Sequence, residues 1–252
     1  MYFWGKHASL PKGRLGDDDD LEEQHSIYDC YTNLSRKGSH IYFYDEINEV
    51  TARVFRKLYE DAKEYLTMKY ADEALMTNKL PETVTIHINS PGGNVLESFA
   101  LYDYLSTCPI PCVAVVEGIA ASGATILLMG CMHRMMTENS MILIHELRSG
   151  WEFSKYSSIK DETENLDILM KRIKSIYAAN TKIPAKELDE ILRHDVFFDA
   201  STSLRLGLTD QTIHNNNLRD LITVATEEKA KTKKKPAKKT ASKKKEEPAK
   251  EE

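Results

Sequence analysis

The sequence predicts an α/β fold, because strand-like segments are followed by a short turn and then by a helix-like segment. Residues 83–88 alternate between polar and apolar side chains, which is typical of a strand with one buried face. The turn Ser90–Gly93 separates this strand from helix-like residues 95–105. The same order returns where a buried strand at 113–116 precedes helix-like residues 123–129. The chain has 252 residues, of which 41% are hydrophobic, and this is enough to bury a sizeable core.

The part of the chain before residue 83 is predicted to hold one strand and one long helix. Residues 41–44 are apolar or aromatic and predict a buried strand. Residues 46–68 predict a helix whose apolar residues recur on one face: Val50, Val54, Leu58 and Ala62. Residues 69–81 are polar and irregular, so we expect a loop insertion there.

Beyond the strand at 113–116, a tight turn of small residues is predicted at 118–122. It leads into the helix at 123–129, which Gly130 should end. Two further short strands are expected at 134–136 and 141–144.

Three more helices are predicted toward the C-terminus. Residues 159–177 predict a long helix with an apolar stripe of four residues: Leu166, Leu169, Ile173 and Ile176. Pro184 is a favourable first-turn residue for a second helix that reaches about Arg193. After a short extended piece at 196–198, Asp199 is expected to cap a helix that Gly207 ends.

Composition divides the chain into a flexible N-terminal arm at 1–26, a globular domain at 27–217 and a Lys/Glu-rich tail at 218–252. The formal net charge is −5, but residues 227–252 hold 11 Lys and 6 Glu, which leaves −10 for the rest. An acidic body argues against a nucleic-acid-binding core. The tail has no apolar face and is expected to be disordered. We do not expect it to contact nucleic acid; the alternative is a weak electrostatic contact with nucleic acid or an acidic partner.

The sequence also predicts a cytoplasmic protein without a membrane partner. Its first 20 residues lack a basic segment followed by an apolar one, so we see no signal peptide. The most apolar run, 112–129, is short and is interrupted by Glu117 and two glycines. Its four cysteines show no C-x-x-C spacing, and we expect them to be reduced rather than to hold a metal: Cys30, Cys108, Cys112 and Cys131.

One candidate for chemistry is Ser122, which lies among small residues between a buried strand and a helix. A serine at a helix N-terminus faces free backbone N–H groups and the positive end of the helix dipole. Such donors stabilise the oxyanion that forms when the hydroxyl attacks a carbonyl carbon, so Ser122 is a candidate nucleophile. The alternative is that Ser122 only caps the helix.

A second candidate is the turn Asn89–Gly93, which follows one strand and precedes a helix. Its consecutive glycines allow backbone conformations that direct N–H groups toward a ligand, and one of these groups could be a second oxyanion donor. The alternative is an ordinary turn.

His145 ends the apolar strand at 141–144 and is the candidate general base. The alternative is a core histidine with no role in catalysis. Other histidines are less suitable, since His133 lies in a loop, His87 is on the polar face of its strand and His194 is at a helix end.

Asp195 precedes three apolar residues at 196–198, so we expect its carboxylate to be partly buried. A buried carboxylate needs a partner, and a histidine N–H is a natural one. The alternative is a surface residue at a helix end.

Taken together, these segments resemble the proteolytic subunit of the Clp protease, over about residues 27–213. Five motifs carry the resemblance: I-N-S-P-G-G at 88–93, G-I-A-A-S at 118–122, N-S-M-I-L-I-H at 139–145, D-V-F-F-D-A at 195–200 and G-L-T-D at 207–210. They occur in the order that the family has, with a long helix between His145 and Asp195.

The resemblance implies a serine endopeptidase that hydrolyses unfolded polypeptides to short peptides. Ser122 would be the nucleophile, His145 the general base and Asp195 the residue that orients it. The backbone N–H groups of Gly93 and Gly123 would form the oxyanion hole.

It further implies a crotonase-like spiral of ββα units, with residues 146–179 as a protruding helical handle. Gly92, Leu147 and Arg148 would line the substrate groove. Family members form homo-oligomers of stacked seven-membered rings that enclose a chamber, and an ATP-dependent AAA+ unfoldase feeds them. The peptidase itself needs no cofactor or metal, and the unfoldase uses the ATP.

The sequence departs from the family pattern at several places. Gly123 stands where the family usually has methionine, and Leu147-Arg148 replaces the usual proline after the histidine. The region at 69–81 is longer than in the common enzyme, and the arm at 1–26 does not match visibly. These departures concern cleavage preference, ring size and the unfoldase, and leave the triad intact.

Three other interpretations are compatible with parts of the sequence. One is a catalytically inactive ring or scaffold subunit that keeps the fold. Another is a crotonase-superfamily enzyme acting on an acyl-coenzyme A thioester, which would use the paired N–H groups but no Ser/His/Asp set. The last is a Ser–Lys signal-peptide peptidase, a typically membrane-attached class for which the chain offers no clear lysine.

Overall fold

The computed structural model describes residues 32–74, 83–150 and 155–214. The expected arm at 1–26 and tail at 218–252 lie outside these ranges, as does most of the expected insertion at 69–81. The described ranges fall within the expected globular domain.

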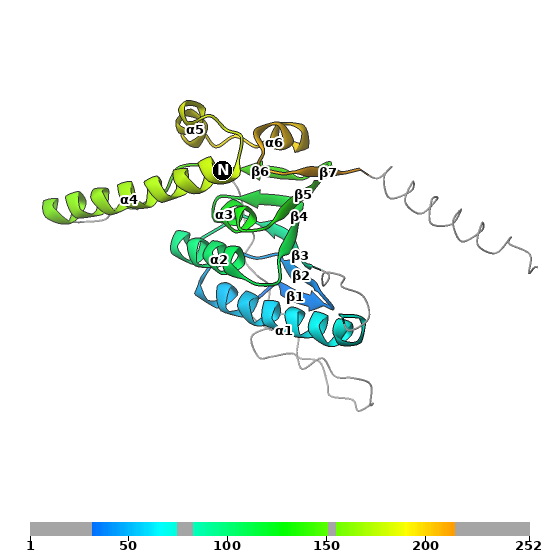
Figure 1. Cartoon of the computed structure of the whole chain (residues 1–252). Helices are drawn as coiled ribbons and strands as arrows, with labels where there is room; N and C mark the ends of the chain where they lie inside the picture. The colour runs from blue at the N-terminus through cyan, green and yellow to red at the C-terminus, as the bar shows by residue number, and fades with distance from the viewer. Residues whose placement is uncertain (1–31, 75–82, 151–154, 215–252) are drawn as a thin grey trace, which may run out of the picture.

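The described residues form seven strands and six helices around one mixed sheet (Figure 1). Their order along the chain is β1 (Leu34–Lys37), β2 (His40–Phe43), α1 (Glu49–Ala74), β3 (Val84–Ser90), α2 (Val95–Thr107), β4 (Cys112–Ala121), α3 (Gly123–Met129), β5 (His133–Thr137), β6 (Met141–Leu143), α4 (Tyr156–Asn180), α5 (Ala185–Leu192), α6 (Ala200–Leu206) and β7 (Gln211–Ile213).

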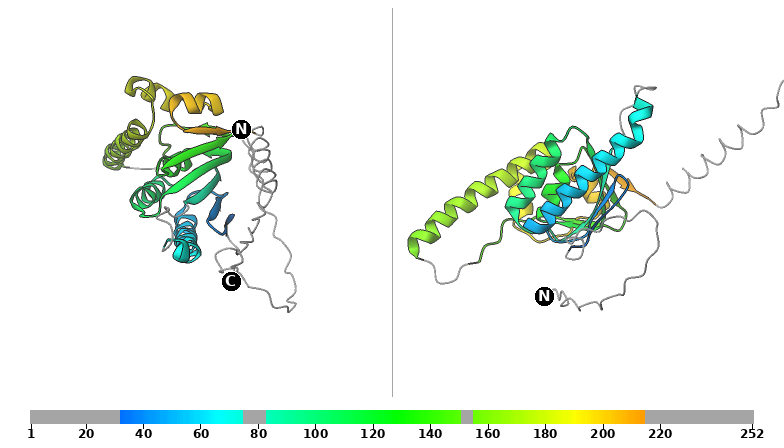
Figure 2. Two further views of the ribbon diagram at one scale, coloured as in Figure 1. Left: turned by 45° about the vertical axis from the view of Figure 1, so that its right-hand side comes forward. Right: turned by 90° about the horizontal axis from the view of Figure 1, so that it is seen from below.

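The sheet has the strand order β1-β2-β3-β4-β5-β7, and β6 pairs with the far half of β4. β1 and β2 are antiparallel, whereas every other pairing is parallel. Helices α1, α2 and α3 each connect two consecutive parallel strands, and Figure 2 shows them on the same side of the sheet. The recurring strand–turn–helix pattern therefore produces the predicted α/β fold.

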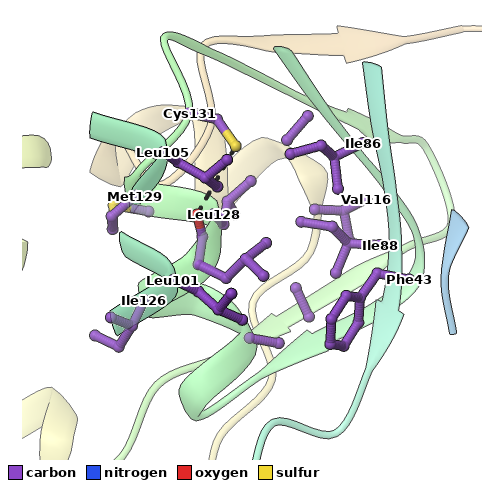
Figure 3. Packing of buried hydrophobic residues seen from close by; sticks show 14 of the residues in the cluster. Phe43, Ile86, Ile88, Leu101, Leu105, Val116, Ile126, Leu128, Met129 and Cys131 are labelled. Atoms are coloured by element: carbon purple, nitrogen blue, oxygen red, sulfur yellow. Dashed lines mark hydrogen bonds between the residues drawn. The ribbon is translucent and has the colours of Figure 1, made fainter. Parts of the chain in front are cut away.

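The core lies between the sheet and these helices. Figure 3 shows Phe43, Ile86 and Ile88 on the strands facing Leu101 and Leu128 on α2 and α3. Burying large apolar side chains is the main contribution to stability here, at about 1.5–3 kcal/mol for each.

Most predicted elements are confirmed to within a few residues, but the predicted face of α1 is only partly correct, since Val54 and Ala62 are buried as predicted. Val50 is 42% exposed, and Leu58 is only half-buried. The residues that directly follow the first three predicted positions are also buried, at Thr51, Phe55 and Tyr59, as is Leu66. The helix also continues to Ala74, into the segment expected to be a loop.

The predicted turn at 118–122 is also wrong, because residues 118–121 continue β4. β6, the strand predicted at 141–144, lies alongside them and pairs Ile119 with Met141, and the sequence does not indicate this pairing. Gly118 bends the strand with φ 93°, and a Cβ there would lie 2.7 Å from Asn89 Oδ1. Only Ser122 remains as the turn.

Helix α4 projects from the body of the molecule (Figures 1 and 2). Only its last turns are anchored, through the buried side chains of Ile173, Ile176 and Tyr177. Tyr156 at its other end is 86% exposed. The structure thus contains the protruding helix expected within 146–179. No helix in the described ranges has both the length and the apolar character that a membrane crossing requires.

Candidate active site

Ser122 occupies a strained junction between β4 and α3. Its φ of 52° and ψ of −122° make it the one non-glycine residue with positive φ among the described residues. Strain of this kind costs about 1–3 kcal/mol and persists only where neighbouring contacts impose it. Here Ser122 N donates to Leu143 O over 2.8 Å, and Ser122 O accepts from Thr125 N at 2.9 Å and Thr125 Oγ1 at 2.6 Å. The Ser122 hydroxyl makes no capping bond to the helix, so a simple N-cap does not account for it.

The glycine turn packs directly against this junction. Gly92 has φ 90°, and a Cβ there would lie 2.4 Å from Ala121 O and 2.6 Å from Gly123 N. The turn is fixed from its other side, because Ile47 N donates to Gly92 O over 2.7 Å and Asn94 N donates to Ile47 O over 2.8 Å. A side chain at Gly92 would therefore push the two turns apart.

The backbones of Gly93 and Gly123 lie next to each other. A Cβ at Gly123 would be 3.3 Å from Gly93 N, and both residues line the same cavity as Ser122. Within the described residues, neither the Gly93 N–H nor the Gly123 N–H donates a hydrogen bond. Two free N–H groups beside a serine hydroxyl can stabilise an oxyanion.

His145 comes close to the serine through strand pairing. β6 pairs Leu143 with Ala121, and His145 follows two residues later. Its Nδ1 lies 2.6 Å from Glu146 O. Because a carbonyl oxygen can only accept, Nδ1 donates this hydrogen bond, and in a neutral imidazole Nε2 is then the acceptor that a general base requires. Within the described residues, no hydrogen bond joins the Ser122 hydroxyl to the His145 ring.

Asp195 differs from the prediction. Its side chain is 54% exposed, so the expectation of a partly buried carboxylate is wrong. The three apolar residues after it do not bury it, since Val196 and Phe197 are themselves 54% and 44% exposed. Asp195 Oδ1 lies 4.0 Å from His145 Nδ1, and Asp195 Oδ2 is paired with the Arg148 guanidinium. The three triad candidates are therefore neighbours that are not joined by hydrogen bonds.

A cavity of about 970 Å³ brings most of the predicted site residues together. Seven of the eight line it: Gly92, Gly93, Ser122, Gly123, His145, Leu147 and Arg148. Asp195 does not. The volume is at the upper end of the range for ligand sites.

The rest of the lining includes residues that the sequence did not single out. Acidic side chains enter at Asp45, Glu46 and Glu146, and an apolar part is formed by Val95, Ile126, Ile173 and Tyr177. These residues come from segments far apart in the sequence, and no local motif marks them.

The competing histidines do not line this cavity. His87 is hydrogen-bonded to Glu117 over 2.7 Å and to His40 over 2.9 Å, on the polar face where it was predicted. Tyr44 donates to the same Glu117 carboxylate, and burial together with this carboxylate raises the pKa of the Tyr44 phenol above its usual value. Among residues 32–74, 83–150 and 155–214, no group of three or more His, Cys, Asp or Glu side chains is arranged to hold a metal ion.

Comparison with known proteins identifies the fold and the family of the chain. A solved structure of a ClpP1 mutant from Listeria monocytogenes matches with a TM-score of 0.55 and 20% sequence identity, covering 71% of this chain and 94% of that one. This likeness supports the shared crotonase-like fold. The Clp protease family model matches residues 22–216, well over half of the 252 residues. The chain therefore belongs to the Clp protease family.

Proposed function

We propose that this protein is a serine endopeptidase that hydrolyses unfolded polypeptides to short peptides by acyl transfer. The observation that carries the proposal is the strained Ser122, whose hydroxyl caps nothing and which shares a cavity with two free backbone N–H groups and His145. This combination of nucleophile, base and oxyanion donors is what acyl transfer needs.

In the proposed reaction, the Ser122 hydroxyl attacks the peptide carbonyl while His145 Nε2 takes its proton. The Gly93 and Gly123 N–H groups stabilise the oxyanion. His145 then gives the proton to the leaving amine, and a water molecule hydrolyses the acyl-enzyme by the same route. Asp195 orients His145 once its carboxylate has moved from 4.0 Å into hydrogen-bond range.

Membership of the family supports a proposal for the assembly as well. We place the protein in the cytoplasm as a homo-oligomer of stacked rings around a chamber, fed by an AAA+ unfoldase. The peptidase then needs no cofactor of its own, because the unfoldase uses the ATP. The exposed apolar side chains on the projecting α4 favour contacts with other copies of the chain: Tyr156, Ile159 and Ile168.

An inactive scaffold subunit is the second candidate function. It is favoured by the exposed Asp195 and by the absence of a hydrogen bond between Ser122 and His145 in the described part of the chain. Catalytic hydrogen bonds are often long in unliganded enzymes, however, and tighten in the substrate complex. No observation favours an acyl-coenzyme A enzyme.

The test is labelling with a fluorophosphonate, which forms a covalent adduct with an activated serine. We expect an adduct on Ser122, located by mass spectrometry, that Ser122→Ala abolishes. Ser201→Ala, which changes an exposed serine on α6, should label like the wild type. If a folded, assembled sample gives no adduct on Ser122, the scaffold function is the better account.

A further inference from the structure

Arg148 and His145 both have access to the Asp195 carboxylate. Asp195 Oδ2 accepts from Arg148 Nη2, whereas Asp195 Oδ1 is 4.0 Å from His145 Nδ1. The His145 Nδ1–H instead donates to Glu146 O at 2.6 Å. The carboxylate that should orient the base is therefore paired with the Arg148 guanidinium instead.

A backbone hydrogen bond fixes the two segments that carry Arg148 and Asp195 relative to each other. Glu146 N donates to Leu192 O over 2.7 Å and ties the segment after β6 to the end of α5. Asp195 follows three residues after Leu192, and Arg148 three residues after His145. Small side-chain rotations of Arg148 and Asp195 can therefore change their partners while the segment after β6 and the end of α5 stay in place.

Arg148 also faces the substrate cavity. Among the described residues that line it, Arg148 is the one Lys or Arg, and the other charged side chains are acidic: Asp45, Glu46 and Glu146. The Arg148 side chain is 70% exposed, so its guanidinium is open to a bound chain. A guanidinium in a groove binds a carboxylate through paired N–H donors.

We infer that Arg148 is a positioning residue that holds Asp195 away from His145, and that an acidic side chain of the substrate releases Asp195 by taking over Arg148. The freed carboxylate then accepts from His145 Nδ1 and completes the triad. The site thereby favours substrates with Glu or Asp near the scissile bond. This inference rests on the proposed peptidase function.

The energies involved suit such an exchange. Both members of the pair are more than half exposed, and exposed ion pairs are weak. The Arg148–Asp195 pair should therefore favour the unaligned triad by no more than about fivefold. A carboxylate held in the cavity at high local concentration can compete with it, and the three acidic lining residues confine that carboxylate to the neighbourhood of Arg148.

The first test uses fluorogenic peptide pairs that differ only in Glu or Gln at one position, scanned along the peptide. For the wild type we expect one position at which Glu raises kcat by about two- to fivefold. Arg148→Gln should abolish that preference and cleave the Gln peptide faster than the wild type does. Arg148→Lys should keep a reduced preference, because the charge remains without the paired donors.

Arg193→Gln is the matched control, since Arg193 is 66% exposed, pairs with Glu190 and does not line the cavity. It should leave the preference unchanged. If Arg148→Gln slows both peptides equally, Arg148 only supports the fold of the site and the inference is wrong. A wild type that shows no preference at any position also overturns it.

A structural measurement separates this inference from the proposed function. In a crystal structure of Arg148→Gln, the distance from His145 Nδ1 to Asp195 Oδ1 should contract from 4.0 Å to about 3 Å. An unchanged distance contradicts the role of Arg148, even where Ser122 is labelled by fluorophosphonate. Absence of labelling with a contracted distance contradicts the peptidase function and leaves the positioning role supported.

Discussion

Gly123 is the residue at which this site departs most clearly from the family pattern. A neighbouring side chain explains why a residue without a side chain is needed there. A Cβ at Gly123 would lie 2.4 Å from Ser98 Oγ, and the next nearest atoms are N and O of Gly93 at 3.3 and 3.5 Å. Ser98 is fully buried on α2, and its hydroxyl donates to Asn94 O over 2.7 Å. The Ser98 hydroxyl therefore occupies the space that a side chain at Gly123 would need.

Gly123→Ala should destabilise the protein by about 1–3 kcal/mol, because it overpacks the junction with α2. It should also lower kcat/KM for peptide cleavage by displacing the oxyanion donors. Adding Ser98→Ala should recover most of both losses, since the clash is with Oγ alone and the Ser98 Cβ is more distant. Denaturant unfolding and peptide kinetics on the two single variants and the double variant check this as a double-mutant cycle. Additive losses would show that Ser98 is not the obstacle.

At this scale, the sequence predicted the residue types that the site uses but not their geometry. Ser122, His145 and the glycines could be found because small residues and a strand-ending histidine are local patterns. The positive φ of Ser122 is set by Leu143 and Thr125, which approach only in the folded chain. The exposure of Asp195 was not predicted. The apolar residues that follow it do not reveal from the sequence whether they face the core or the surface.

At the scale of elements, the Ser122 turn is linked to the projecting helix α4 through a buried hydrogen bond. Thr125 Oγ1 lies 2.6 Å from Ser122 O and 2.6 Å from the Tyr177 hydroxyl. The threonine's single proton goes to the carbonyl, so the Tyr177 hydroxyl must donate to Thr125 Oγ1. Burial raises the pKa of the Tyr177 phenol, which therefore stays protonated as this donation requires. Helix α4 thus reaches the Ser122 turn through α3.

Tyr177→Phe removes this donor but keeps the ring that packs in the core. We expect a loss of about 1 kcal/mol in the free energy of unfolding, because one buried hydrogen bond disappears and the Thr125 hydroxyl keeps its bond to Ser122 O. Tyr156→Phe is the control on the same helix, where the tyrosine is 86% exposed, and it should change little. Urea unfolding of the three proteins measures the difference. Equal stabilities would mean that the contact contributes nothing to anchoring α4.

The strands that could not be predicted from the sequence are those that only pairing with a neighbouring strand defines. β1 and β7 are strands of four and three residues at the two edges of the sheet. Each is too short for a periodic pattern, and pairing with β2 or β5 defines it. The long helices and the central strands were predicted because a buried face imposes a repeat that the sequence itself displays.

For the whole molecule, one ion pair joins the far edge of the sheet to the base of α4. Arg134 on β5 binds the Asp210 carboxylate through Nε at 3.0 Å and Nη2 at 2.7 Å, and its Nη1 donates to Asn180 O over 2.8 Å. Asp210 also accepts from Arg134 N at 2.8 Å. The Arg134 side chain is only 11% exposed, so the guanidinium depends on this carboxylate for its neutralisation.

Asp210→Asn should therefore lower the free energy of unfolding at pH 7 by about 2 kcal/mol, since it leaves a largely buried guanidinium without a counter-charge. The loss should depend on pH.

Burial alone would raise the pKa of Asp210, but the hydrogen bonds and charge of Arg134 outweigh it and hold that pKa below its usual value. A carboxyl group whose pKa is depressed on folding adds stability above its unfolded pKa, about 3.9, and that stability is lost as the pH falls through the folded pKa. The difference between wild type and Asp210→Asn should accordingly be constant near neutrality and shrink below about pH 4. Unfolding curves from pH 7 downward measure it, with Asp189→Asn as the control, because Asp189 pairs with Lys174 but is 52% exposed and should cost under about 1 kcal/mol. A loss at Asp210 that matches the control, or that stays the same down to pH 3, would mean that Arg134 is neutralised in another way and that the edge of the sheet and α4 are held together by packing alone.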